Sequence, residues 1–190
     1  MTVDWPEHAS QQVAFHWDHH VRPRLEGLTD DEYFWEPVPH SWSIRPRGQA
    51  VTSMAAGRGD WVADFEFPEP VPAPVTTIAW RLGHVLVGVL GMRNASHFSG
   101  PPVDYQSVTW PPDALTARRQ LDAAYATWSA GVASLDVGRW GSPVGPAEGP
   151  FADRPYAELV LHINREVIHH MAEVLLLRDL YRHRTGDNAN

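Results

Sequence analysis

The sequence predicts an all-α fold, a four-helix bundle formed by a single domain over residues 1–190. Three observations support this prediction. Four long segments carry apolar residues at helical spacing, no segment has a convincing strand pattern, and 190 residues suffice for one hydrophobic core. Hydrophobic residues make up 43% of the chain, which is ordinary for a globular protein. The long connection expected between the first two helices allows a topology other than simple up-and-down.

The first helix is predicted over about residues 9–26. Pro23 can kink or end it, and Gly27 is a suitable helix end. Thr29 and Glu32 then form a capping-box pattern that opens a short helical turn. The predicted inward stripe of the first helix comprises Val13, Trp17, His20, Val21 and Leu25.

Residues 37–75 form a long connection that is rich in proline, glycine and aromatic residues and has no helical period. Connections of this length are usually functional or carry short structure of their own, and residues 40–45 alternate enough for a short strand. Trp42 and Arg45 are candidate substrate-binding residues, because they can stack on or pair with an anionic substrate. The alternative, which we favour, is that they cover the bundle.

Three further helices follow the connection. The second, from Ile78 to about His97, is apolar almost all round and should be central. The third runs from about residue 112 or 113 to 135, and the last from near Asp153 to about Arg184. Residues 185–190 are expected to form a frayed tail.

The composition excludes several classes of chemistry. There is no cysteine and no lysine, which excludes disulfides, thiolate nucleophiles, lysine Schiff bases and lysine-bearing phosphate loops. A net charge of -8 without a basic run argues against binding to nucleic acid or to an anionic membrane. We expect a cytoplasmic protein, because no apolar run is long enough to span a membrane and the start lacks a leader pattern.

Glu166 and His170 lie four residues apart in the predicted last helix, so they share one face. A carboxylate and an imidazole at this spacing can bind one divalent cation, although an isolated pair is more commonly a solvated face. The inward stripe of this helix includes His170, and a carboxylate that faces the core needs a metal or an arginine partner. The candidate arginines are Arg81, Arg93 and Arg165.

His84 is the natural third ligand, because it is the only histidine in the middle of the apolar second helix. Taken alone, a neutral core histidine with one hydrogen bond is the commoner case. Trp80 lies one turn before His84, and His162 lies one turn before Glu166. We expect Trp80 to line the cavity and His162 to support a ligand or act as a fourth one, whereas His169 should point aside.

A competing histidine cluster lies in the first helix, where His16 and His20 are also four residues apart. No third ligand is implied for this pair. We therefore favour a solvated face for His16 and His19, with His20 packed or lining the cavity.

One histidine on the second helix and Glu-x-x-x-His on the last resemble the DinB-like superfamily of metal-binding four-helix bundles, which includes the amino-terminal domain of mycothiol-dependent maleylpyruvate isomerase and the bacillithiol transferases. The resemblance implies a metal triad of His84, Glu166 and His170, with Glu at a position that is usually His. Zinc is the first choice of metal and nickel the second, since imidazole suits both. The segments that look like actinobacterial members are residues 28–37, 77–84 and 166–174.

The resemblance implies a metal-dependent thiol S-transferase or thiol-assisted isomerase. Its partners would be a low-molecular-weight thiol such as mycothiol and an electrophilic substrate, and the protein would be a homodimer. The same three ligand types also match the facial triad of non-haem iron oxygenases, which the bundle context disfavours. The alternative of a different class is a non-catalytic dimeric metal-binding or stress-response module with a vestigial site.

Overall fold

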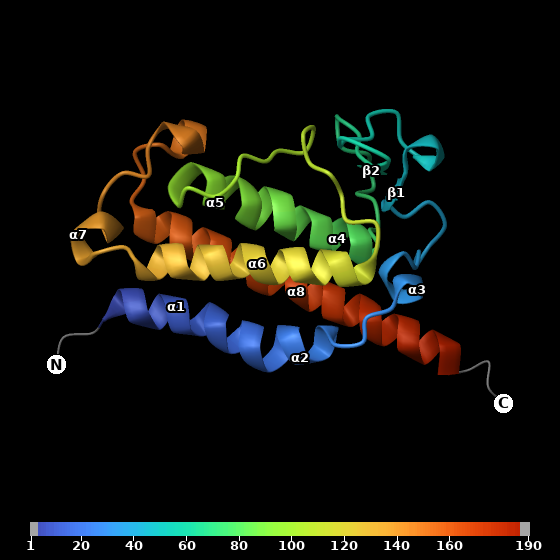
Figure 1. The fold of residues 1–190 in the computed structure, drawn as a ribbon, viewed down its shortest axis with the longest axis horizontal. Coiled ribbons are helices and arrows are strands. Elements are labelled where there is room, and N and C mark those ends of the chain that lie inside the picture. The colour runs from blue at the N-terminus through green and yellow to red at the C-terminus, as the bar shows by residue number, and fades with distance from the viewer. Residues whose placement is uncertain (1–3, 187–190) are drawn as a thin grey trace.

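The computed structural model describes residues 4–186, and four long helical segments packed side by side form its body (Figure 1). This confirms the predicted helical bundle. The first segment comprises α1 (Trp5–His16), the π-helical η1 (Trp17–Val21) and α2 (Arg22–Leu25). The second comprises α4 (Ile78–His84), the π-helical η3 (Val85–Gly91) and α5 (Met92–His97). The third is α6 (Ala114–Ala133) and the fourth is α8 (Tyr156–Gly186).

Side-chain caps begin most of these helices. The first helix starts before the predicted residue 9, because the Asp4 carboxylate accepts a hydrogen bond from the Glu7 amide and a proline occupies the first turn. Thr77 caps α4 and Asp113 caps α6 in the same way. The last helix continues through Gly186, so the first two residues of the predicted tail are helical, and residues 187–190 lie outside the described part.

The predicted inward stripe of the first segment is wrong at His20, which is exposed. The stripe assumed regular α-helical spacing, but residues 17–21 form a π-helical turn with wider hydrogen-bonded spacing. Trp17 and Val21 remain buried at the two ends of this turn, and Trp17 stacks on Tyr125 of α6 with ring centroids 3.9 Å apart. The π turn therefore rotates His20 out of the core.

Helix directions show that the bundle is not up-and-down. Ala9 and Asn164 form a hydrogen bond, as do Arg24 and Asp179, so α1–α2 and α8 run parallel. The segment α4–α5 is parallel to α6 and antiparallel to α8, and residues 98–113 cross back over the bundle between α5 and α6 (Figure 1). The crossover therefore follows the second helix, whereas the sequence pointed to the connection after the first.

The short helix α3 (Asp30–Tyr33) lies just before the long connection. The connection itself contains a small antiparallel hairpin of β1 (Ile44–Pro46) and β2 (Trp61–Ala63), in which Arg45 lies opposite Val62. A short 3₁₀ helix, η2 (Arg47–Gln49), follows β1. The strand begins later than the expected residues 40–45. Its partner has no separate signal in the sequence, because three-residue strands are defined by their pairing.

A buried carboxylate holds this connection together. Asp64 is fully buried and accepts hydrogen bonds from the amides of Ser43 and Val51 and from Arg45 Nε, the last at 2.8 Å. Arg45 also pairs with Glu36 at 2.7 Å. These interactions place Arg45 in the packing of the connection, as the favoured alternative expected.

Trp42 is buried as well, at 7% exposure, against the rings of Phe65 and Trp80. This position also agrees with the covering role. Substrate binding by Trp42 or Arg45 stays a prediction. Within residues 4–186, none of the helices is both long and apolar enough to cross a membrane.

Candidate metal centre

The three predicted ligands come together between α4 and α8. His84 is the last residue of α4, and its ring centroid lies 4.7 Å from that of His170 on α8. Glu166 lies one turn before His170, with its Oε2 3.3 Å from His170 Nε2. A cavity of about 380 Å³ is lined by His84, Glu166 and His162 among others. The predicted site therefore borders on an open space that a small molecule can enter.

A tyrosine from the crossover loop fixes the ring of His84. The Tyr105 hydroxyl lies 2.7 Å from His84 Nδ1, and the Trp80 ring stacks on the imidazole with ring planes 12° apart. Tyr105 reaches this position because residue 88 is glycine: a Cβ on Gly88 would lie 2.2 Å from the hydroxyl oxygen. When Nδ1–H donates to this oxygen, Nε2 is the nitrogen available to a ligand.

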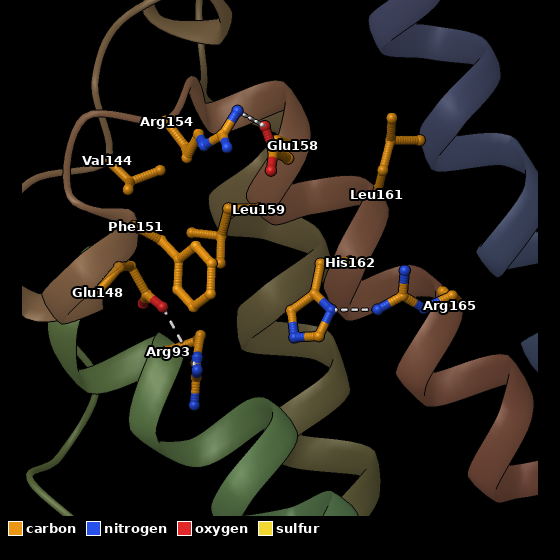
Figure 2. Close-up of a pocket in the computed structure, with 10 residues that line it drawn as sticks. All are labelled: Arg93, Val144, Glu148, Phe151, Arg154, Glu158, Leu159, Leu161, His162 and Arg165. Atoms are coloured by element: carbon orange, nitrogen blue, oxygen red, sulfur yellow. Dashed lines mark hydrogen bonds and ion pairs between the residues drawn. The ribbon is translucent and has the colours of Figure 1, made fainter.

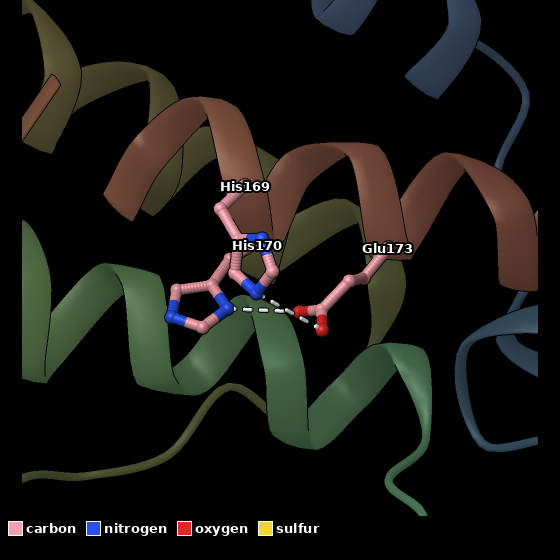
Figure 3. Close-up of side chains that lie close together, drawn as sticks. All are labelled: His169, His170 and Glu173. Atoms are coloured by element: carbon pink, nitrogen blue, oxygen red, sulfur yellow. Dashed lines mark hydrogen bonds and ion pairs between the residues drawn. The ribbon is translucent and has the colours of Figure 1, made fainter. Parts of the chain in front are cut away.

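A carboxylate fixes the ring of His170 in the same way. His170 Nδ1 donates to Glu173 Oε2 at 2.8 Å, as Figure 3 shows, and Arg81 Nε lies 3.1 Å from the same oxygen. Because a carboxylate only accepts, Nδ1 carries the proton in this hydrogen bond, while Nε2 faces the Glu166 carboxylate at 3.3 Å and Arg81 Nη1 lies 3.4 Å from Nδ1. Histidines that bind metals are typically held by such a carboxylate.

The protonation states suit a cation. Burial, together with the nearby His170 and Arg81, lowers the pKa of His84 to about 4, so this imidazole is neutral near pH 7. Burial raises the pKa of Glu166, but the hydrogen bond from Arg165 and the nearby His162 and His170 outweigh it, and the net shift is downward. The neutral imidazole of His84 and the ionised carboxylate of Glu166 are both ligand types that suit zinc or nickel.

A second group of potential ligands shares His170. One ligand atom from each of His169, His170 and Glu173 lies within 4.8 Å of the other two, so this group could hold a metal. Among residues 4–186, this is the group of three whose ligand atoms all lie within 4.8 Å of one another. The ligand atoms of the predicted set, His84, Glu166 and His170, do not meet this distance limit. Metal binding by His84, Glu166 and His170 stays a prediction.

No role was predicted for Glu173 from the sequence, and His169 was predicted to point aside. A signal for Glu173 existed in its i, i+4 spacing from His169 and its i, i+3 spacing from His170. Tyr105 had no signal, because its contact with His84 depends on the path of the crossover loop.

The remaining predicted residues fall into two groups. His162 lies beside Glu166, with Nδ1 3.6 Å from Oε1, and it also contacts Arg165. In the first helix, the rings of His16 and His20 are 5.7 Å apart, and the buried His16 Nε2 has no hydrogen-bond partner among the described residues. Burial lowers the pKa of His16 and the neighbouring His20 lowers it further. No third described ligand joins this pair.

The model of one protein family matches most of the chain. It is the DinB superfamily, and it matches residues 12–174, which include the second and third helical segments, most of the first and the last, and every predicted metal ligand. No curated protein and no solved structure matches the sequence significantly.

Proposed function

Because the chain belongs to the DinB superfamily, we propose that it is a metal-dependent enzyme whose His84, Glu166 and His170 bind a divalent cation, zinc first and nickel second. The observation that carries the proposal is the orientation of the two imidazoles. A separate side chain contacts Nδ1 of each ring, Tyr105 for His84 and Glu173 for His170. In the tautomer that carries the proton on Nδ1, each Nε2 can bind a cation.

Two features favour this set over the group of His169, His170 and Glu173. Arg81 Nε lies 3.1 Å from the Glu173 carboxylate, so a cation bound by Glu173 would compete with this guanidinium for the same oxygen. The His169 side chain is 64% exposed, whereas the His170 side chain is 11% exposed. Glu173 therefore acts as the residue that orients His170.

The reaction that we propose is transfer or isomerisation assisted by a low-molecular-weight thiol of the mycothiol type. A divalent cation in this site would lower the pKa of a thiol and stabilise the resulting anion as a nucleophile. The protein has no cysteine, so the sulfur must come from a co-substrate. The S–H bond breaks and the sulfur forms a bond to the electrophilic carbon of the second substrate. In a transfer, the bond from that carbon to its leaving group breaks and the leaving group takes up a proton; in a thiol-assisted isomerisation, a carbon–carbon π bond breaks on addition and forms again when the thiol leaves. The protein would work as a homodimer, which light scattering can test.

A second candidate function is a metal-binding or stress-response module without turnover. The observation that favours it is the ion pair between Glu166 and Arg165, whose Oε1 and Nη2 lie 3.1 Å apart. An arginine that satisfies the carboxylate is what a vestigial site would contain.

Metal content tests the proposed centre first. Untagged protein loaded with zinc or nickel should bind about one equivalent, measured by plasma mass spectrometry after gel filtration. His84→Ala and Glu166→Gln should lose this metal, while His169→Ala, a matched histidine control on the same helix, should retain it. Equal loss in His169→Ala would move the metal to the alternative group, and equally low metal in every variant would refute the centre.

Thiol consumption then separates the enzyme from the binding module. Loaded protein is mixed with mycothiol, bacillithiol or glutathione and a panel of electrophiles, and free thiol is followed with time. Metal-dependent consumption that is absent from His84→Ala supports the enzyme. If the loaded protein consumes no thiol with any electrophile in the panel, the binding module is the better description.

A further inference from the structure

A pocket of about 430 Å³ lies between α8 and the 3₁₀ helix η4 (Pro146–Phe151), next to the candidate metal centre. Figure 2 shows its lining, which combines three arginines with apolar side chains. We call it the arginine pocket and define it by Arg93, Phe151, Arg154, Leu159, Leu161 and Arg165. We propose that it binds the carboxylate of a small organic acid that has an apolar body. Its assignment as the substrate-binding part of the enzyme rests on the proposed function, whereas acid binding itself does not.

The arginine pocket adjoins the metal-site cavity. Arg93 and His162 line both spaces, and the second space also contains His84 and Glu166. A molecule anchored in the arginine pocket can therefore extend its reactive end toward the predicted ligands.

Charge favours an anion in this pocket. Two glutamates, Glu148 and Glu158, also line the pocket, and Glu158 pairs with Arg154. The hydrogen bond with His97 lowers the pKa of Glu148, with Arg93 adding to the shift. This carboxylate is therefore already engaged, at 2.9 Å from His97 Nε2 and 3.3 Å from Arg93 Nη2. Arg93 Nε is also buried and has no hydrogen-bond acceptor among the described residues, which is costly unless a ligand supplies one.

Two more arginines lie at the rim, where a ligand can reach them. The Arg154 side chain is 63% exposed and forms a long ion pair of 3.7 Å with Glu158. The Arg165 side chain is 69% exposed; its Nη2 lies 3.1 Å from Glu166 Oε1 and 2.6 Å from His162 Nδ1, but a guanidinium has five N–H donors, so others can reach a ligand. Guanidinium groups bind carboxylates with paired, charge-assisted hydrogen bonds. The guanidinium groups at the rim can therefore bind a ligand carboxylate, because the long ion pair of Arg154 leaves most of its N–H donors available.

The apolar residues specify the rest of the ligand. Phe151 and Leu161 are 60% and 57% exposed, and they lie in the same pocket as the buried Leu159. Small-molecule sites combine such apolar walls with a few polar anchors, and a volume near 430 Å³ suits a small ligand. An aromatic or branched aliphatic acid fits this combination better than a sugar or an inorganic anion.

The wall formed by η4 is held rigidly. Glu148 binds His97, whose Nδ1 lies 2.9 Å from the Tyr156 hydroxyl, and Arg139 donates to the same hydroxyl at 3.1 Å. These contacts connect η4 to α5, α7 (Val137–Trp140) and the start of α8. The pocket is therefore formed before a ligand arrives, which reduces the entropic cost of binding.

Calorimetry with benzoate, phenylacetate and 4-phenylbutyrate tests the proposal, with the corresponding neutral amides as controls. The protein is treated with EDTA, so that binding is measured without metal. At least one acid should bind, and its amide should bind at least tenfold more weakly. If the amides bind as well as the acids, or if no acid binds, the proposal is overturned.

Matched variants locate the site. The double variant Arg154→Gln/Arg165→Gln should weaken acid binding at least tenfold, and Phe151→Ala should weaken it for the aromatic acids. Arg119→Gln, which removes an exposed arginine of α6 outside the pocket, should leave it unchanged. Equal weakening by Arg119→Gln would indicate a general charge effect and would overturn the proposal.

The same acids are also titrated into His84→Ala. If the acids bind His84→Ala as they bind the wild type, and the wild type binds no metal, the arginine pocket is supported and the proposed metal centre is refuted. Normal metal content without acid binding would leave the proposed function intact and remove only this inference.

Discussion

Replacing Arg178 with methionine should destabilise the protein strongly, because Arg178 is the buried charge that joins α8 to the first half of the chain. Arg178 is 1% exposed, and its Nε lies 3.1 Å from Oε1 of Glu32, whose side chain is also buried. It further donates to the backbone oxygens of Arg24 and Glu26 at the end of the first helical segment. Burial raises the pKa of Glu32, but Arg178 and the Thr29 amide outweigh it, so the pKa is lowered and Glu32 is ionised.

The magnitude follows from what the variant leaves behind. Removing one partner of a buried ion pair costs about 3–5 kcal/mol, because the other charge remains buried. Glu32 would keep the Thr29 amide at 3.0 Å and the half-exposed Arg182 at 3.2 Å. These two partners place the expected loss near the lower limit, at about 3 kcal/mol.

Urea unfolding followed by tryptophan fluorescence measures this loss. Arg182→Met is the matched control, because it removes an arginine that contacts the same carboxylate from a 55% exposed position. It should cost less than about 1 kcal/mol. If Arg178→Met unfolds within about 1 kcal/mol of the wild type, or no earlier than Arg182→Met, the buried pair does not stabilise the fold as argued.

Three other perturbations give distinct outcomes. Tyr105→Phe removes the hydroxyl that contacts His84 Nδ1, so it should weaken zinc or nickel binding about 10–100-fold while the fold is retained. Nitrogen-15 NMR should show that His84 loses its preference for the tautomer with the proton on Nδ1. Unchanged metal affinity and an unchanged tautomer would contradict this prediction. The pKa of His84 is about 4 in the folded protein and 6.5 in the unfolded chain, so protonation of His84 favours unfolding. As the pH falls from 6.5 to 4, the free energy of unfolding of the metal-free wild type should decrease by roughly 3 kcal/mol relative to that of His84→Gln, measured by urea titration. Parallel pH profiles of the two proteins would refute the shift. Gly131→Ala should lower the melting temperature by costing about 1–3 kcal/mol, because its Cβ would lie 2.2 Å from the Phe98 ring; a stabilised variant would show that the ring moves freely.

Local sequence signals predicted the elements of the fold. Helical spacing of apolar residues identified all four long helices, and the predicted start of the second at Ile78 agrees with the start of α4. The capping box of Thr29 and Glu32 is present as predicted. These features depend on interactions within about one helical turn, so a single sequence contains them.

The arrangement of the helices was decided by contacts distant in the chain. The parallel pairing of α4–α5 with α6, and the crossover of residues 98–113 that it requires, follow from packing such as that of Phe98 against Gly131. The hairpin partner β2 is defined by pairing with β1 and has no periodic signal of its own. The π turn at residues 17–21 likewise altered which side chains are buried, and His20 left the core as a result.

For the candidate site, the i, i+4 spacing by itself placed Glu166 and His170 on one face of a helix, because helical geometry fixes that relation. Only the tertiary structure decided that His84 faces His170, since the two residues are brought together by the antiparallel packing of α4 on α8. The orienting contact of Tyr105 depends on a loop path that no local pattern encodes. The sequence therefore determined which ligand types each helix can offer, and long-range packing determined which of them meet.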